Sequence, residues 1–213
     1  MNPYTLYNML LYKQDKPLLA VWKMTESNDE LLAMLGEARS YPDIEAVAHS
    51  EIRLRERLTA LALVKTLLGR EVEIKHAENG APYLVGEPWH ISISHTKGYA
   101  AVQLDGERAA GIDIEYRSDR VKRIRSRFLA PEEEQNIDTA HEEEHLLVYW
   151  CAKEALYKLA GQEEVDFREQ LHISPFPYRP EGSLEAWESR SERRQTATLA
   201  YRVEPEYVLV WSI

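Results

Sequence analysis

The amino-acid sequence predicts an α+β protein built from two similar lobes, and two observations support this prediction. Segments with helical apolar spacing alternate with short segments rich in β-branched and aromatic residues. The order of helices followed by strands occurs twice, in residues 1–105 and again in residues 106–213. We therefore expect an N-terminal and a C-terminal α+β lobe joined near residues 105–115, although no clear internal repeat proves a duplication.

The expected N-terminal lobe begins with a strand over residues 17–24 and a short helix over 28–38. A longer apolar helix follows over residues 46–69, with Gly69 as its expected C-cap. From Glu71 the apolar spacing changes, because short β-rich runs are now separated by Gly, Pro, Asn and Asp. These runs predict strands over residues 71–76, 82–85, 89–96 and 99–105.

The expected C-terminal lobe starts with the strand 109–116. Pro131 is well placed in the first turn of a short helix. Thr139 and Glu142 have the spacing of a capping box, so we expect the next helix to start there and run to about Ala160. Further strands are expected over residues 171–174, 184–187, 196–203 and 207–213.

Charge and cysteine usage exclude several classes of protein. The chain has 26 Lys and Arg against 36 Asp and Glu, and its net charge of -10 argues against a general nucleic-acid surface. The single cysteine, Cys151, excludes an intrachain disulfide and is expected in the core. Residues 1–17 lack the unbroken apolar segment of a signal peptide, and no run suits a membrane span. We therefore expect a soluble cytoplasmic protein.

The stretch "GIDIEY" places two carboxylates in an otherwise apolar strand. Since side chains alternate along a strand, Asp113 and Glu115 should share one face and Ile112 and Ile114 the other. Two carboxylates on one face form part of a site for a hard cation such as Mg²⁺. The alternative is the solvated face of an amphipathic strand.

The stretch "WCAKEALYK" places an acid and an amine in a helix that is apolar nearly all round. Glu154 and Lys158 are four residues apart and should be neighbours on the helix surface. If the helix is buried, these charged groups need partners. They could simply pair with each other, but a site shared with Asp113 and Glu115 explains all four residues together.

The stretch "HISISHTKGY" and the arginines of a preceding helix could bind an anion. His95 lies at the end of a strand, where side chains and exposed N–H groups can hold a phosphate. The alternative for His95 is a structural hydrogen bond. Arg53, Arg55 and Arg57 could add phosphate contacts or form a charged helix face.

These motifs together resemble those of a known family. "ISISHT", "GIDIE" and "WCAKEALYK" look like the signature of the 4'-phosphopantetheinyl transferases, and the match covers about Gly80 to Gly161. The length and two-lobed layout are similar to the monomeric Sfp-type branch. The resemblance implies Mg²⁺-dependent transfer of the phosphopantetheine group of coenzyme A to a serine of an apo carrier protein, such as an acyl or peptidyl carrier protein.

The resemblance also implies roles for individual residues. Asp113, Glu115 and Glu154 would bind Mg²⁺ against the pyrophosphate, and Glu154 would be the base, directly or through water. Lys158 would contact phosphate and neutralise the charge that develops on the leaving group. The residues that the resemblance implies as contacts for coenzyme A phosphates are Ser94, His95, Lys158 and, as a weaker match, Arg53.

Two features leave alternatives open. Ala81 stands where many family members have a lysine, which removes one expected contact to coenzyme A and is compatible with a catalytically decayed binder of coenzyme A or carrier protein. A Mg²⁺-dependent phosphodiesterase that uses water in place of the serine is a second alternative. Because carrier proteins are usually acidic, residues 120–128, with Arg123 and Arg125, are expected to form a local basic docking surface.

Overall fold

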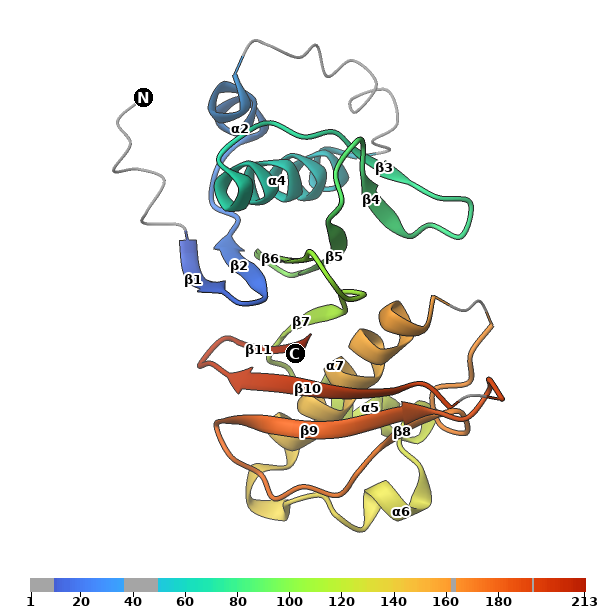
Figure 1. Cartoon of the computed structure of the whole chain (residues 1–213). Coiled ribbons are helices and arrows are strands. Elements are labelled where there is room, and N and C mark those ends of the chain that lie inside the picture. The colour runs from blue at the N-terminus through green and yellow to red at the C-terminus, as the bar shows by residue number, and fades with distance from the viewer. Residues whose placement is uncertain (1–9, 37–49, 162–163, 193) are drawn as a thin grey trace.

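The computed structural model of the chain describes residues 10–36, 50–161, 164–192 and 194–213 (Figure 1). Its described residues form a four-stranded sheet, a five-stranded sheet and a two-stranded hairpin, with long helices packed on the two larger sheets. The predicted α+β fold class is therefore confirmed. The division into similar lobes at residues 105 and 106 stays a prediction.

The first sheet has the strand order β1-β2-β6-β5 and is antiparallel throughout. Its central strands pack against α4, in a core that includes Trp22, Leu63 and Val102. The hairpin β3–β4 follows α4 along the chain. The elements are β1 (Leu10–Asp15), β2 (Leu18–Lys23), α2 (Asn28–Leu35), α4 (Glu51–Leu68), β3 (Ile74–His76), β4 (Pro82–Leu84), β5 (His90–Thr96) and β6 (Tyr99–Asp105).

The structure confirms the expected strands and helices in this part of the chain and adds β1. The sequence did not predict β1, because this outer strand is only half-buried and has no continuous apolar run. Gly69 adopts a left-handed conformation with φ 70° and ends α4 as predicted. The last predicted residues of α2, 37–38, and the first predicted residues of α4, 46–49, lie outside the described residues.

The second sheet has the order β7-β11-β10-β9-β8 and is also antiparallel (Figure 1). Helix α7 packs on it through a core that includes Leu156, Leu199 and Val210. The elements are β7 (Ile112–Tyr116), α5 (Arg120–Ile124), η1 (Arg125–Arg127), α6 (Pro131–Glu134), η2 (Thr139–His141), α7 (Glu142–Ala160), β8 (Leu171–Ile173), β9 (Glu181–Glu188), β10 (Thr196–Val203) and β11 (Tyr207–Ser212).

Local sequence patterns predicted some of the helix ends correctly but not all of them. Pro131 starts α6, and Gly161 ends α7 with φ 58°, as the sequence predicts. The predicted capping role of Thr139 is wrong. The side chain of Asp138 accepts hydrogen bonds from the N–H groups of Ala140 and His141 and so begins the short helical turn before α7.

The two larger sheets meet through an apolar layer. Leu19, Val21 and Ala101 of the first sheet share a buried cluster with Ile112 and Ile114 of β7. This cluster lies on the opposite side of the first sheet from α4, since neighbouring residues of β2 alternate between the two cores. Strand β7 is therefore held between the first sheet and α7, which positions the carboxylates described below.

Candidate active site

The two faces of β7 separate apolar from acidic side chains, as the sequence predicts. Ile112 and Ile114 point into the layer between the sheets. Asp113 alternates to the other face and is 5% exposed, while Glu115 is half-buried. The alternative of a fully solvated acidic face is therefore wrong.

A glycine lets β7 begin in direct contact with α7. A Cβ atom on Gly111 would lie 2.5 Å from the main-chain oxygen of Ala155 and 2.6 Å from Cγ of Leu159. Real Cβ atoms do not approach other atoms so closely, so any side chain here would push the helix away from the strand. Gly111 therefore sets the distance across which groups of α7 reach Asp113, a role that sequence reasoning missed.

Lys158 is the direct link between α7 and β7. Its ammonium group donates to Oδ1 of Asp113 at 2.9 Å and to the main-chain oxygen of Ile112 at 2.8 Å. No ion pair joins Lys158 to Glu154 in the described part of the chain. The predicted site shared between strand and helix thus explains the lysine better than pairing within the helix.

Both carboxylates of β7 are held by further hydrogen bonds. Ser94 donates from Oγ to Oδ1 of Asp113 at 2.7 Å. Glu115 accepts from Nε1 of Trp150 at 3.1 Å and from Oγ1 of Thr96 at 3.1 Å. The second oxygen of Asp113, Oδ2, is buried and has no hydrogen-bond partner among the described residues. Asp113 therefore has one buried oxygen that accepts no hydrogen bond, and the buried thiol of Cys151 lies beside this carboxylate.

Glu154 lies in a strongly perturbed environment. Burial and the neighbouring charge of Asp113 raise the pKa of Glu154 to about 7, with Lys158 opposing the rise and Glu115 adding to it. Burial and Asp113 likewise raise the pKa of Glu115. The three carboxyl groups are therefore close enough to repel one another when ionised, and a cation or proton among them would be stabilised.

The residues present are compatible with a divalent cation. The unpartnered Oδ2 of Asp113 and the mutual repulsion with Glu115 and Glu154 both favour a positive ion, and carboxylate oxygens are ligands that Mg²⁺ accepts. Across residues 10–36, 50–161, 164–192 and 194–213, however, no group of three or more His, Cys, Asp or Glu side chains is arranged to hold a metal ion. The metal assignment to this triad thus remains a proposal.

A second group of charged side chains lies where β5 approaches α4. Nε2 of His95 is 3.4 Å from Nη1 of Arg53, and Nδ1 of His95 is 3.2 Å from Oε1 of Glu56. Arg53 also pairs with Glu56 at 3.0 Å. Burial lowers the pKa of His95; Glu56 opposes this shift, whereas Arg53 and Lys158 add to it. The structure therefore brings His95 and Arg53 together, and it adds Glu56, which the sequence did not single out.

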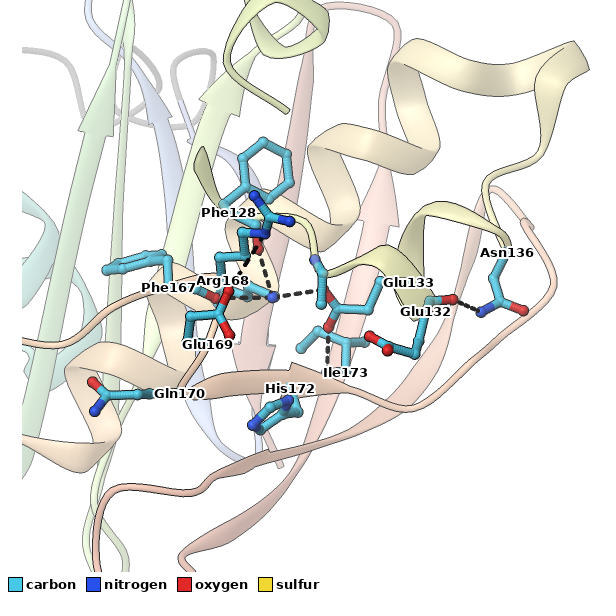
Figure 2. A network of polar contacts seen from close by, with 12 residues as sticks. Phe128, Glu132, Glu133, Asn136, Phe167, Arg168, Glu169, Gln170, His172 and Ile173 are labelled. Carbon is cyan, nitrogen blue, oxygen red and sulfur yellow. Dashed lines mark hydrogen bonds and ion pairs between the residues drawn. The ribbon is translucent and has the colours of Figure 1, made fainter. Parts of the chain in front are cut away.

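Sequence reasoning also missed Lys153, which directly precedes Glu154. Lys153 is fully buried and donates to Glu133 and to the main-chain oxygens of Phe128 and Phe167. Figure 2 shows these three acceptors turned toward the same ammonium group. The sequence could have indicated that Lys153 needs a partner, because a charged residue in an apolar helix must be paired. It does not identify Glu133 as that partner.

Comparison with known proteins links this site to a family. Residues 109–203, which include all of β7 and α7, match the model of the 4'-phosphopantetheinyl transferase superfamily. This segment contains Asp113, Glu115, Glu154 and Lys158. No helix in the part of the chain that the structure describes is long and apolar enough to cross a membrane.

Two curated proteins are similar to the chain, and both are provisionally named as 4'-phosphopantetheinyl transferases. A protein of Synechocystis sp. is 26% identical over 157 residues, which cover 70% of this chain and 62% of the relative. A protein of Haemophilus influenzae is 36% identical over 97 residues, which cover 42% of this chain and 40% of the relative. The chain thus aligns with less than two thirds of the length of either relative.

Proposed function

We propose that the protein transfers the 4'-phosphopantetheine group from coenzyme A to a serine of an apo carrier protein, because residues 109–203 match the model of the 4'-phosphopantetheinyl transferase superfamily. The observation that best supports this proposal is the ion pair between Asp113 and Lys158, which lies close to the carboxyl groups of Glu154 and Glu115. The proposal includes dependence on Mg²⁺ and the Sfp-type branch, with a monomeric chain that acts in the cytoplasm.

The proposed reaction breaks the phosphoanhydride bond of coenzyme A and forms a phosphoester bond to the carrier serine. The serine oxygen of the carrier attacks the phosphorus that bears pantetheine, and the bond from this phosphorus to the bridging oxygen of the pyrophosphate breaks. Adenosine 3',5'-bisphosphate leaves with the bridging oxygen. The serine proton passes to Glu154, directly or through a water molecule. Such transfers depend mainly on positioning and on stabilising charge, which is what the charged groups around Asp113 can provide.

Asp113, Glu115 and Glu154 would hold the Mg²⁺ ion, which when bound would neutralise charge on the pyrophosphate. Lys158 has three N–H donors, and the hydrogen bonds to Ile112 and Asp113 use two of them. The third N–H could donate to a phosphate oxygen. Lys158 would then stabilise the leaving group while still holding Asp113 in place.

His95 and Arg53 would bind phosphates of coenzyme A, since they form a cationic group beside the carboxylates when His95 is protonated. An anion near them would favour the protonated form of His95. Ser94 is less suited to this predicted role, because its single hydroxyl proton already goes to Asp113. A hydrogen bond donated by Ser94 to phosphate would require this contact to break.

The carrier protein would dock on the basic segment that follows β7. Lys122 pairs with Glu142, and Arg125 pairs with Glu134 and Glu142, so two of the basic charges are already neutralised. The more exposed cations of the segment are Arg120, Arg123 and Arg127. These three arginines are the proposed contact for an acidic carrier.

The test is intact-mass spectrometry of apo carrier proteins incubated with the full chain, coenzyme A and Mg²⁺. We expect a mass gain of one phosphopantetheine group with the wild type and none with Glu154→Gln. Glu132→Gln, the same change at an exposed position of α6, is the matched control and should transfer normally. Consumption of coenzyme A without carrier would instead indicate a phosphodiesterase, and binding without either reaction would indicate a decayed binder.

A further inference from the structure

The outer strands of the two larger sheets face each other without pairing through their main chains. Strand β5 is outermost in the first sheet, and β7 is outermost in the second. An unpaired strand edge leaves N–H groups that need acceptors. Here the acceptors come from hydroxyl side chains that occur at every second position of β5, namely Ser92, Ser94 and Thr96.

The hydroxyls form a regular series because alternate residues of a strand share one face. Each hydroxyl accepts a hydrogen bond from one N–H group of β7, and the three donors are every second residue of that strand, so the two strands keep a fixed register. The bonds run from Ile112 N to Ser92 Oγ at 3.1 Å, from Ile114 N to Ser94 Oγ at 3.4 Å, and from Tyr116 N to Thr96 Oγ1 at 3.1 Å.

Two of these hydroxyls make a second contact. A hydroxyl that accepts from an N–H group can still donate its own proton. Ser94 donates to Asp113 Oδ1 at 2.7 Å, and Thr96 donates to Glu115 Oε2 at 3.1 Å. Within the described residues, Ser92 makes the same contact to the β7 main chain but none to a carboxylate. The series therefore contains two members that hold acids and one that does not.

We propose that Ser94 and Thr96 are positioning residues that orient Asp113 and Glu115 for a divalent cation. Ser94 shares Asp113 Oδ1 with Lys158, so both hydrogen bonds fall on one oxygen, and the buried Oδ2 accepts none among the described residues. Thr96 donates to Oε2 of Glu115, and Trp150 donates to Oε1. Hydrogen bonds that fix ligand side chains raise metal affinity. The inference rests on the proposed function, and it gives Ser94 a role other than the predicted phosphate contact.

The experiment measures binding of Mn²⁺, as a probe for Mg²⁺, by electron paramagnetic resonance of the free ion, with and without coenzyme A. Ser94→Ala and Thr96→Val should each weaken Mn²⁺ binding by about 10-fold in both conditions. Thr96→Ser restores the hydroxyl and should restore affinity. Ser92→Ala removes a main-chain contact of the same kind and should bind Mn²⁺ like the wild type. Thermal unfolding of each variant checks that the chain is folded.

The outcomes separate this inference from the transferase proposal. Wild-type affinity in both Ser94→Ala and Thr96→Val overturns the inference, as does an equal loss in Ser92→Ala or no Mn²⁺ binding by the wild type. A loss in Ser94→Ala that occurs only with coenzyme A overturns the proposal for Ser94 and assigns it to a phosphate contact. A wild-type chain that binds Mn²⁺ but modifies no apo carrier overturns the transferase proposal alone.

Discussion

Helix α7 carries two lysines that pair with carboxylates, and the two pairs differ in how completely their hydrogen bonds are satisfied. Lys153 is fully buried, and its three donors all have acceptors, in Glu133, Phe128 and Phe167. The carboxylate of Glu133 also accepts from the N–H groups of Ala130 and Ile173. This pair has no donor left for a ligand.

Lys158 lies about 1.4 turns further along the same helix, and its pair with Asp113 of β7 is incomplete. The Lys158 side chain is 25% exposed and uses two donors, and Oδ2 of Asp113 has no partner within the described residues. Glu154 adds a carboxyl group whose pKa is raised to about 7 by burial and by Asp113. The comparison indicates that the first pair holds the fold together, whereas the second can bind and stabilise a charged ligand.

The same substitution at both lysines should separate these roles, and the largest effect on stability is expected at Lys153. Lys153→Met leaves Glu133 buried without its cation and should lower the free energy of unfolding by about 3–5 kcal/mol. Urea denaturation followed by circular dichroism measures this loss. A change below about 1 kcal/mol, typical of an exposed ion pair, would contradict the structural role.

A double variant sharpens the result. Replacing both partners, as in Lys153→Met with Glu133→Leu, removes the unpaired charge but leaves main-chain groups of Phe128, Ala130 and Ile173 without partners. Each buried unsatisfied group costs about 1–3 kcal/mol, so the double variant should remain less stable than the wild type. Full recovery would mean that only the buried charge matters.

Lys158→Met should reduce activity rather than stability. The loss of one positioned cation is expected to lower kcat for transfer by about 100-fold, the range found for single groups that stabilise developing charge. The stability loss should be smaller than for Lys153→Met, since the Lys158 side chain reaches solvent. Steady-state kinetics and urea denaturation of the same preparations measure both quantities. A folded Lys158→Met protein with wild-type kcat would exclude the proposed role.

The sequence was sufficient for most features that depend on nearby residues, with the cap before α7 as an exception. The alternation of Asp113 and Glu115 with Ile112 and Ile114 follows from strand geometry alone. Gly161 ends α7 because a local left-handed conformation suits glycine. Short runs of β-branched and aromatic residues likewise predicted the apolar strands of the two larger sheets. The sequence also indicated that Glu154 and Lys158 need partners elsewhere, because their helix is apolar on nearly every side.

Most features that the sequence did not reveal depend on residues that are distant along the chain. Glu133 reaches Lys153 across 20 residues, and Ser94 reaches Asp113 across 19. No periodicity encodes which hydroxyl faces which carboxylate, since that requires β5 and β7 to be placed side by side by their sheets. Thr139 was predicted as a cap from its spacing to Glu142, but Asp138 competes for the same N–H groups and accepts from two of them.

A buried carboxylate whose hydrogen bonds are all made, Glu188, predicts that the stability of the protein depends on pH. Burial disfavours the ionised form of Glu188, but hydrogen bonds from Ser191 and from the N–H groups of Gln195 and Arg190 outweigh it and lower the pKa of Glu188 to about 2. An unfolded glutamate has a pKa of about 4.3. The ionised Glu188 therefore stabilises the folded protein fully above about pH 4.3, and this stabilisation is lost as the pH falls toward 2.

Glu188→Gln tests this dependence. The wild type should exceed the variant in free energy of unfolding at pH 7, and the difference should shrink between about pH 4 and pH 2. Urea denaturation at a series of pH values measures the difference. A difference in free energy of unfolding that stays constant down to pH 2 would show that the charge of Glu188 does not contribute to stability.

The smallest expected effect concerns the basic segment, where paired and exposed cations occur together. Arg125 is held by Glu134 and Glu142, whereas Arg127 is exposed and Arg123 makes only an exposed ion pair with Asp119. Charge reversal at Arg123 and Arg127 should raise the KM for an acidic carrier about 5-fold, since exposed charge pairs contribute about 1 kcal/mol at most. The KM for coenzyme A should not change.

Lys13→Glu is the matched control for this change, because Lys13 is exposed on β1, at the opposite edge of the first sheet from β5. It alters net charge by the same amount per residue and should leave the KM for carrier unchanged. The effect of the arginine variants should also weaken as salt is added, since exposed charges are screened. An equal increase in KM for Lys13→Glu would indicate a response to net charge, and the docking surface would then lie elsewhere.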